Sequence, residues 1–290
     1  MGGGMNVSAM RPELPPLTCA VCGGTEISSR GKEPGGHPLV ECGRCGVWSV
    51  HDPPSPESLR SRYVEDYYLP WRDEVHARRR MWRRRLRLLG NARKGRLLDV
   101  GCAEGDFLAQ ASEAGFTVEG TELSVHGARK TSLGLGVPVH CGELAEAGLP
   151  AGSFSVVTFW HVLEHMLHPG RALGEARRIL EPDGLLVVAV PNRSNPLFRA
   201  AYRIARGRPL YLYHPKDREQ HLHHWSPPSL KAALECRGFQ VQPLRPDPCA
   251  LGVVKSALDL AGRLHSLLAG APRTQAMVAL ARAASGGGTR

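Results

Sequence analysis

The sequence predicts an open, doubly wound α/β domain with a mostly parallel sheet, preceded by a small cysteine-rich unit. From residue 96 onward, short apolar runs alternate with helical stretches, which is typical of α/β folds. The runs RLLDV, SVVTF and LLVVAV are apolar throughout, as expected for strands buried on both faces of a parallel sheet. The separate unit is indicated by two closely spaced cysteine pairs, Cys19 with Cys22 and Cys42 with Cys45.

The composition favours a globular protein. The chain has 290 residues, of which 42% are hydrophobic, so it can bury a sizeable core. No apolar run approaches the roughly 20 residues that a membrane-spanning helix needs. The first residues also lack the apolar segment of a secretory signal. The other four cysteines (Cys102, Cys141, Cys236 and Cys249) are scattered, which fits a reducing compartment. We therefore expect a soluble, cytoplasmic protein.

We divide the chain into a flexible leader (1–17), the cysteine unit (18–50), a Pro-rich linker (51–58) and a main domain (59–290). The two C-x-x-C pairs are 19 residues apart, which matches the spacing of zinc ribbons. Cys19, Cys22, Cys42 and Cys45 are thus predicted to hold one structural zinc ion, which replaces a core too small to form alone. Such ribbons bind nucleic acid, bind proteins or brace a neighbouring domain, and the sequence leaves this choice open.

Residues 72–96 hold ten Arg and one Lys and contribute much of the net charge of +10. This segment predicts either a surface for nucleic acid or an acidic substrate, or a solvated helix. We favour the solvated helix, because charged runs on helices usually face water. Its apolar residues would then turn inward, namely Met81, Trp82, Leu86, Leu88 and Leu89.

The main domain is expected to contain a core (95–245), a lid (192–225), and a C-terminal helix and strand (251–285). Strands are predicted at 96–100, 117–123, 138–143, 154–161, 185–191, 239–244 and 274–283. Helices are predicted at 106–115, 124–134, 170–180, 226–238 and 253–270. Ser124 and Ser226 are the expected N-caps of two of these helices. The lid shows no clear strand.

The segment LLDVGCAEGDF (97–107) forms the first strand–turn–helix, where ligands bind in doubly wound sheets. Gly101 and Gly105 let the backbone approach a ligand closely, and the helix amides can face a negative group. A dinucleotide site would have glycines where Ala103 and Asp106 stand, and no P-loop motif is present.

S-adenosylmethionine fits this loop better than a dinucleotide does. Glu104 and Asp106 occupy positions where a pyrophosphate would lie, which disfavours NAD. S-adenosylmethionine carries an ammonium and a sulfonium group but no phosphate, so nearby acids are tolerated. Glu122 ends the second predicted strand, where a carboxylate can accept both ribose hydroxyls.

Residues 95–245 resemble the class I S-adenosylmethionine-dependent methyltransferases (type 11/23-like). The resemblance is carried by LLDVGCAEGDF, GTELS, HCGELAEAGLPAGSFSVVTFWHVLEHMLHP, GLLVVAVPN and HLHHWSPPSLKAALECRGFQV. It implies a Rossmann-like fold with a seven-stranded sheet, and transfer of a methyl group from S-adenosylmethionine. Two departures are Ala103, where many members have Gly, and Glu143, where Asp is frequent.

The resemblance also implies the residues that surround the cofactor. Its methionine end would be lined by Asp99, Gly101 and Gly105. Its ribose and adenine edge would contact Glu122 and Leu123, and Glu143 with Leu144 would flank the adenine. Further contacts are implied for Cys102, Ala103, Phe107 and Trp160.

The segment HVLEH (161–165) follows the fourth predicted strand and so lies at the ligand end of the sheet. Methyl transfer requires an aligned acceptor and removal of its proton, which suits a histidine. His161 and His165 are the candidate general bases, and His221, His223 and His224 could reach over from the lid.

Two other interpretations of HVLEH stay open. Glu164 and His165 could simply brace the following loop. Together with His161 they also resemble the E-x-x-E-H metal site of some methyltransferases, with a further ligand from a later histidine. Here His161 replaces the first Glu, which disfavours Mg²⁺, an ion that prefers oxygen ligands.

We expect methyl transfer to a small-molecule acceptor, such as a sugar, a phenol or a natural-product intermediate. The acceptor would enter over residues 192–225, where Tyr202, Tyr211, Tyr213 and Trp225 offer stacking surfaces. One alternative is an RNA-modifying enzyme or RNA-binding ribbon protein. Another is a regulator that binds the cofactor without catalysis. The acceptor, the methylated atom and the oligomeric state are not determined by the sequence.

Overall fold

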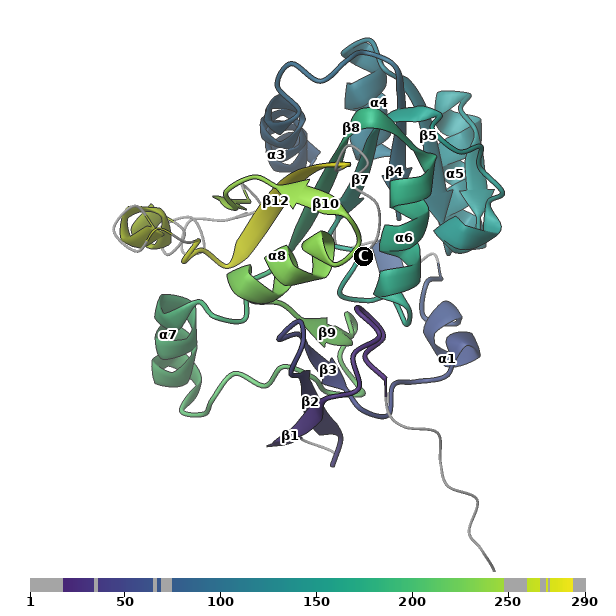
Figure 1. Cartoon of the computed structure of the whole chain (residues 1–290). Helices are drawn as coiled ribbons and strands as arrows, with labels where there is room; N and C mark the ends of the chain where they lie inside the picture. Colours follow the sequence, from purple (N-terminus) through teal and green to yellow (C-terminus); the bar gives the residue numbers. More distant parts are fainter. Residues whose placement is uncertain are drawn as a thin grey trace, which may run out of the picture.

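The computed structural model describes residues 18–33, 36–64, 67–68, 75–247, 260–266, 270 and 272–283. Within this part, a large mixed sheet carries helices on both faces, and a small antiparallel sheet lies against one end of it (Figure 1). The expected leader and Cys249 lie outside the described residues. No helix of the described part is long and apolar enough to cross a membrane.

The large sheet confirms the expected doubly wound, mostly parallel architecture. Its spatial order is β10 (Phe239–Val241), β12 (Ala276–Ala283), β8 (Leu180–Pro191), β7 (Phe154–Trp160), β4 (Arg96–Val100), β5 (Thr117–Glu122), β6 (Val139–Cys141). The strands from β8 to β6 are parallel, whereas β12 and β10 are antiparallel to their neighbours. A two-residue strand, β11 (Arg245–Pro246), pairs with β12 beside this series of seven.

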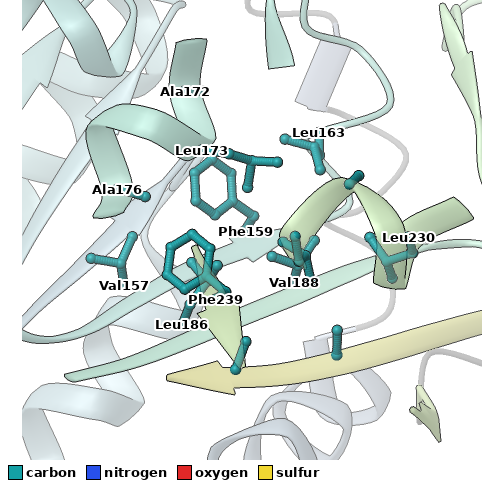
Figure 2. Packing of buried hydrophobic residues seen from close by; sticks show 14 of the residues in the cluster. Val157, Phe159, Leu163, Ala172, Leu173, Ala176, Leu186, Val188, Leu230 and Phe239 are labelled. Atoms are coloured by element: carbon teal, nitrogen blue, oxygen red, sulfur yellow. The ribbon is translucent and has the colours of Figure 1, made fainter. Parts of the chain in front are cut away.

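Most of the helices pack on the sheet through two apolar layers, one on each face. The helices of the main domain are α3 (Val75–Leu88), α4 (Asp106–Glu113), α5 (Val125–Leu135), α6 (Pro169–Ile179), α7 (Pro196–Arg206) and α8 (Pro227–Glu235), with a 3₁₀ turn, η1, at Leu144–Glu146. Successive residues of β8 alternate between the layers: Leu186 and Val188 face α6, whereas Leu185 and Val187 face α4. Figure 2 shows the first of these layers. Burial on both faces explains why these strands are apolar throughout.

Most of the predicted elements are present, and the differences have local causes. The side chain of Ser124 accepts a hydrogen bond from the Gly127 amide, and Ser226 caps α8 in the same way. The final segment is a strand, as predicted. Within the predicted helix at 253–270, residues 260–266 are helical and residue 270 lies in a turn. The lid contains α7, which the sequence analysis missed. It was marked in the sequence by its Asn195 cap, by Pro196 and by apolar residues at helical spacing, although none of its residues is buried.

The cysteine unit forms the small sheet, with β1 (Ile27–Lys32), β2 (Pro38–Cys42) and β3 (Trp48–Val50). The fourth strand of this sheet, β9 (His223–His224), comes from the lid and pairs with β3. The short helix α1 (Pro56–Arg60) begins within the predicted linker. The unit is therefore joined to the main domain through its own sheet.

Candidate active site

A cavity of about 1030 Å³ opens beyond the carboxyl ends of β4, β5 and β7. One part of its wall contains Gly101 and Glu122 from the predicted cofactor loops. Another part contains His165 and His221. The two regions that the sequence singled out thus share one cavity.

The loop after β4 is shaped by contacts within the chain. Gly101 has φ +71°, and a Cβ there would lie 2.5 Å from Val162 Cγ2. Gly105 has φ +85°, and a Cβ there would lie 2.7 Å from Thr131 Cγ2 on α5. A side chain at either position would therefore have to displace a neighbouring side chain. Ala103 also has a positive φ, +50°, in this loop.

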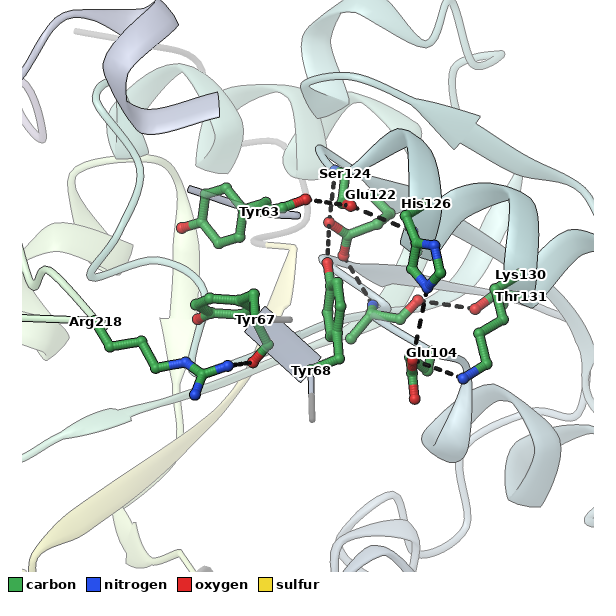
Figure 3. A network of polar contacts seen from close by, with 12 residues as sticks. Tyr63, Tyr67, Tyr68, Glu104, Glu122, Ser124, His126, Lys130, Thr131 and Arg218 are labelled. Atoms are coloured by element: carbon green, nitrogen blue, oxygen red, sulfur yellow. Dashed lines mark hydrogen bonds and ion pairs between the residues drawn. The ribbon is translucent and has the colours of Figure 1, made fainter. Parts of the chain in front are cut away.

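Glu122, at the end of β5, is held by three donors (Figure 3). Its carboxylate accepts hydrogen bonds from the amides of Ala103 at 2.9 Å and Ser124 at 2.8 Å, and from the Tyr68 hydroxyl at 3.2 Å. Burial raises the pKa of Glu122 above its usual value, although these donors oppose that effect. The side chain is therefore fixed at the wall of the cavity, with its orientation set by the glycine loop.

Asp99 lies in the buried layer beneath this loop. The Thr158 hydroxyl donates to its Oδ1 at 2.6 Å, and the side chain is 3% exposed. Burial raises the pKa of Asp99 to about 7, against the opposing effect of the Thr158 hydrogen bond. This carboxyl group therefore changes protonation near neutral pH.

His161 connects the cavity to a buried ion pair. Its backbone φ is +57°, and its Nε2 lies 2.8 Å from Asp247 Oδ2. Arg85, from α3, donates to both oxygens of Asp247, at 2.6 and 3.0 Å. Burial acts to raise the pKa of Asp247, but Arg85 and His161 together hold it below its ordinary value. Asp247 is therefore ionised, and it accepts a hydrogen bond from the protonated Nε2 of His161.

Glu164 is a buried carboxylate beside three histidines. It is 1% exposed, and within the described structure neither of its oxygens accepts a hydrogen bond. Burial acts to raise its pKa, but His161, His165 and His221 together lower it. One ligand atom each from Glu164, His165 and His221 lie within 4.8 Å of one another.

The ring of His165 has a defined tautomer. Its Nδ1 lies 2.8 Å from the carbonyl oxygen of Gln220, which can only accept, so Nδ1 carries the proton. The other nitrogen, Nε2, then has a lone pair available to accept a proton or bind a cation. This arrangement suits proton abstraction at the histidine end of the cavity.

Comparisons with known proteins agree with this geometry. A family described as "Methyltransferase domain" matches residues 74–244, which is more than half of the chain. The chain belongs to this methyltransferase family. The methyltransferase is 28% identical over 149 residues to a probable S-adenosylmethionine-dependent methyltransferase of Mycolicibacterium smegmatis, covering 50% of this chain and 52% of that protein. It is 35% identical over 108 residues to a ubiquinone biosynthesis O-methyltransferase of Caulobacter sp. strain K31, covering 34% and 42%.

The methyltransferase spans about half the length of these two relatives. Among solved structures, a SAM-dependent methyltransferase from Archaeoglobus fulgidus superposes with a TM-score of 0.53 and 18% identity, covering 76% of this chain and 99% of that one. At this identity the likeness supports the fold alone. S-adenosylmethionine as the methyl donor follows from the family.

The predicted cofactor residues of the methyltransferase fall into two groups. Those that line the cavity are Gly101, Ala103, Glu122, Leu123, Glu143, Leu144 and Trp160. Those behind this wall are Asp99, Cys102, Gly105 and Phe107, which pack against the sheet and the neighbouring helices. The backbone amide of Glu143 is bonded to the Glu146 carboxylate, at 3.1 Å, within the turn η1.

The structure also adds residues that the sequence did not indicate. Asp247 bonds His161 and is itself held by Arg85, and no local motif marks either residue. Tyr63, Tyr67 and Tyr68 line the cavity, and their aromatic cluster is visible in the sequence.

The stacking surfaces expected in the lid are not formed as predicted. Tyr213 and Trp225 are 2% and 0% exposed, because they pack inside the apolar layers. Tyr202 and Tyr211 belong to α7 and the segment after it, and neither lines the cavity described above. His221 does reach the cavity, whereas His223 and His224 are buried in β9.

The four N-terminal cysteines gather as the sequence predicts, with their sulfur atoms all within 4.8 Å. The Sγ atoms of Cys19 and Cys45 are 3.7 Å apart, and those of Cys22 and Cys42 are 3.5 Å apart. Four sulfurs at about 2.3 Å from one tetrahedral zinc ion would be roughly 3.8 Å apart, so the geometry fits such an ion. Each pair is followed by a glycine with positive φ that closes a tight turn.

Proposed function

We propose that this methyltransferase transfers the methyl group of S-adenosylmethionine to a small-molecule acceptor, such as a sugar, a phenol or a natural-product intermediate. The observation that carries this proposal is the single cavity shared by the cofactor loops and the histidine cluster. Its volume of about 1030 Å³ is near the upper end of the range for small-ligand sites. The rings of Tyr63, Tyr67 and Trp160 line it and suit a flat or ring-shaped acceptor.

The chain's own groups would bind and orient the two reactants. When bound, S-adenosylmethionine supplies an electrophilic methyl group on a sulfonium. The Glu122 carboxylate would accept the ribose hydroxyls, and Leu123 and Leu144 would flank the adenine. The Tyr68 hydroxyl, now bonded to Glu122, would move aside or share that carboxylate.

We propose His165 as the general base. Its Nε2 would take the acceptor's proton as the new bond to the methyl carbon forms and the carbon–sulfur bond breaks. The neighbouring Glu164 carboxylate would stabilise the imidazolium that results. His161, in its imidazolium form with Nε2 donating to Asp247, would stabilise the Glu164 carboxylate by its charge, since its Nδ1 is 3.4 Å from Glu164 Oε1.

Replacing His165 tests this role. We expect His165→Ala to lower turnover by about 10²- to 10⁴-fold while the affinity for S-adenosylmethionine stays within about twofold. His51→Ala, an exposed histidine in the N-terminal part, is the matched control and should turn over normally. Unchanged turnover in His165→Ala would leave His165 as a structural brace.

We also propose that the four cysteines bind one structural zinc ion. Metal analysis of the full chain should find one zinc per chain, lost in Cys19→Ser. A second metal equivalent, lost in His221→Ala but retained in Cys19→Ser, would instead assign a cation to Glu164, His165 and His221.

Four thiolate ligands must stay reduced, and the described cysteines are all free, so we propose that the protein works in the cytoplasm.

The main alternative is an RNA substrate, which the exposed arginines of α3 favour. Arg80, Arg83, Arg84 and Arg87 are exposed, whereas Arg78 and Arg85 pair with Asp106 and Asp247. Incubation with radiolabelled cofactor and either fractionated small molecules or RNA separates the two. Label in a small-molecule fraction supports the proposal. Label in RNA, with binding that weakens steeply in salt, supports the alternative. Cofactor binding without transfer to any fraction would indicate a non-catalytic regulator.

A further inference from the structure

We propose that the cysteine-bearing sheet is part of the acceptor site, because its strand β3 positions Glu164, His165 and His221 through β9. Ser49, on β3, is the positioning residue in this scheme. The proposal rests on the proposed function for its effect on turnover, but the contacts that carry it are independent of the acceptor's identity.

The first step is the pairing between the two strands. In the antiparallel pair, Trp48 lies opposite His224, and Ser49 lies opposite His223. The Val50 amide also donates to the Leu222 carbonyl oxygen at 3.0 Å. The lid segment that carries His221 therefore continues the sheet of the cysteine unit.

The second step links this segment to the catalytic loop. The amides of Leu222 and His223 both donate to the Glu164 carbonyl oxygen, at 2.8 and 3.1 Å. The His165 ring donates from Nδ1 to the Gln220 carbonyl oxygen at 2.8 Å. The backbone of Glu164 and the ring of His165 are thus both held by residues 220–223.

The third step is a buried side-chain relay. His223 is 4% exposed, and its Nε2 lies 3.0 Å from the Met166 carbonyl oxygen, so Nε2 carries the proton. Its Nδ1 must then accept, and the Ser49 hydroxyl donates to it at 2.8 Å. Ser49 therefore connects the cysteine unit, β9 and the loop after β7 through a single imidazole.

Strand β9 depends on this support because it has only two residues. So short a pair of strands is marginal in water without a packed or covalently fixed partner. Strand β3 is fixed beside the cysteine cluster, where the Cys42 amide donates to the Val47 carbonyl at 3.1 Å. Zinc binding to the cysteines would thus fix, through β3, the part of the cavity wall that contains Glu164, His165 and His221.

Ser49→Ala tests the proposal in the full, zinc-loaded chain. We expect the amides of Leu222 and His223 to exchange hydrogen at least about tenfold faster, since a buried acceptor loses its donor. Turnover should fall about tenfold, because small misplacements of catalytic groups are costly. Ser49→Thr keeps a hydroxyl and should restore both values. Ser28→Ala, on exposed β1 of the same sheet, should change neither.

Zinc content and cofactor affinity, measured on the same samples, show whether each variant is folded. Both should match the wild type within about twofold, because the Ser49 hydroxyl bonds His223 and no residue of the cofactor loops. Faster exchange confined to β1–β3, or unchanged exchange at Leu222 and His223, would overturn the proposal. So would normal turnover in Ser49→Ala. A wild type that methylates no acceptor would refute the proposed function instead, and the exchange measurement would still decide the structural coupling.

Discussion

At the scale of single residues, the buried carboxylates of this site differ because their neighbours differ. Asp99 is offered one hydroxyl donor at short range, and burial raises its pKa to about 7. Asp247 accepts two hydrogen bonds from the Arg85 guanidinium and one from His161, and together they hold its pKa below the usual value. An equally buried acid is therefore neutral or charged near pH 7 according to the cations beside it.

The raised pKa of Asp99 predicts a pH-dependent stability. In the unfolded chain an aspartate titrates near pH 4, so folding is favoured when Asp99 is protonated. This contribution is fully present below about pH 4 and is lost as pH rises through about 7. Asp99→Asn should remove this loss, so its free energy of unfolding should rise relative to that of the wild type by about 4 kcal/mol between pH 4 and pH 8. Urea unfolding of both proteins without cofactor measures this, and parallel pH profiles would contradict it.

Ala103 shows how the glycine loop tolerates a methyl group. Its φ of +50° destabilises the folded state by about 1 kcal/mol for an L-residue. Glycine would avoid this strain, but it would raise the entropy of the unfolded chain, which lowers stability by a similar amount. Ala103→Gly should therefore change the free energy of unfolding by less than about 1 kcal/mol. Ala103→Val, which is β-branched, should lose on the order of 2 kcal/mol and weaken cofactor binding, because the Ala103 amide holds Glu122. Calorimetry and thermal unfolding would check both, and equal behaviour of the two variants would contradict the prediction.

At the scale of elements, the buried ion pair joins α3 to the chain beside β11. Arg85 and Asp247 are 3% and 0% exposed. The sequence predicted a solvated arginine helix with its apolar residues inward, and Met81 and Leu89 are indeed buried. Arg85 lies on the same buried face, so one arginine of the run has a structural partner that helical spacing could not identify.

Arg85→Met should therefore lower the free energy of unfolding by about 3–5 kcal/mol, because it leaves the Asp247 carboxylate buried without its main cation. Arg84→Met, on the exposed face of the same helix, should change it by less than about 0.5 kcal/mol. The double variant Arg85→Met/Asp247→Leu should recover part of the loss. Urea unfolding at pH 7 would test this, and similar losses in Arg84→Met and Arg85→Met would argue against a specific pair.

At the scale of the whole molecule, the cysteine unit and the main domain share one apolar layer. Val21 and Val47 are fully or almost fully buried and belong to the same cluster as Leu230 and Ala233 of α8. Arg237 also donates to the Val21 carbonyl oxygen at 2.6 Å. Residues 51–58 therefore separate the two parts along the sequence, but the two parts pack against each other in the folded chain.

A chain that begins at residue 51 should consequently be less stable than the full chain. It would expose the surface under Val21 and Val47, whose burial contributes about 1.5–3 kcal/mol each, and it would leave β9 without a partner. We expect a lower thermal midpoint and stronger binding of an apolar dye. An equal midpoint would mean that the cysteine unit is energetically separate.

The sequence alone determined the features that depend on local pattern. Strands such as RLLDV are recognisable because burial on both faces leaves no polar alternation, and the two cysteine pairs because metal ligands need a fixed spacing. The glycine loop and Glu122 are likewise marked by residue type at strand ends. Only the tertiary structure decided which distant groups meet: His161 with Asp247, Tyr68 with Glu122, and Ser49 with His223. Such pairs join residues tens to hundreds of positions apart, so no periodicity records them, and they form only when the sheet brings their strand ends together.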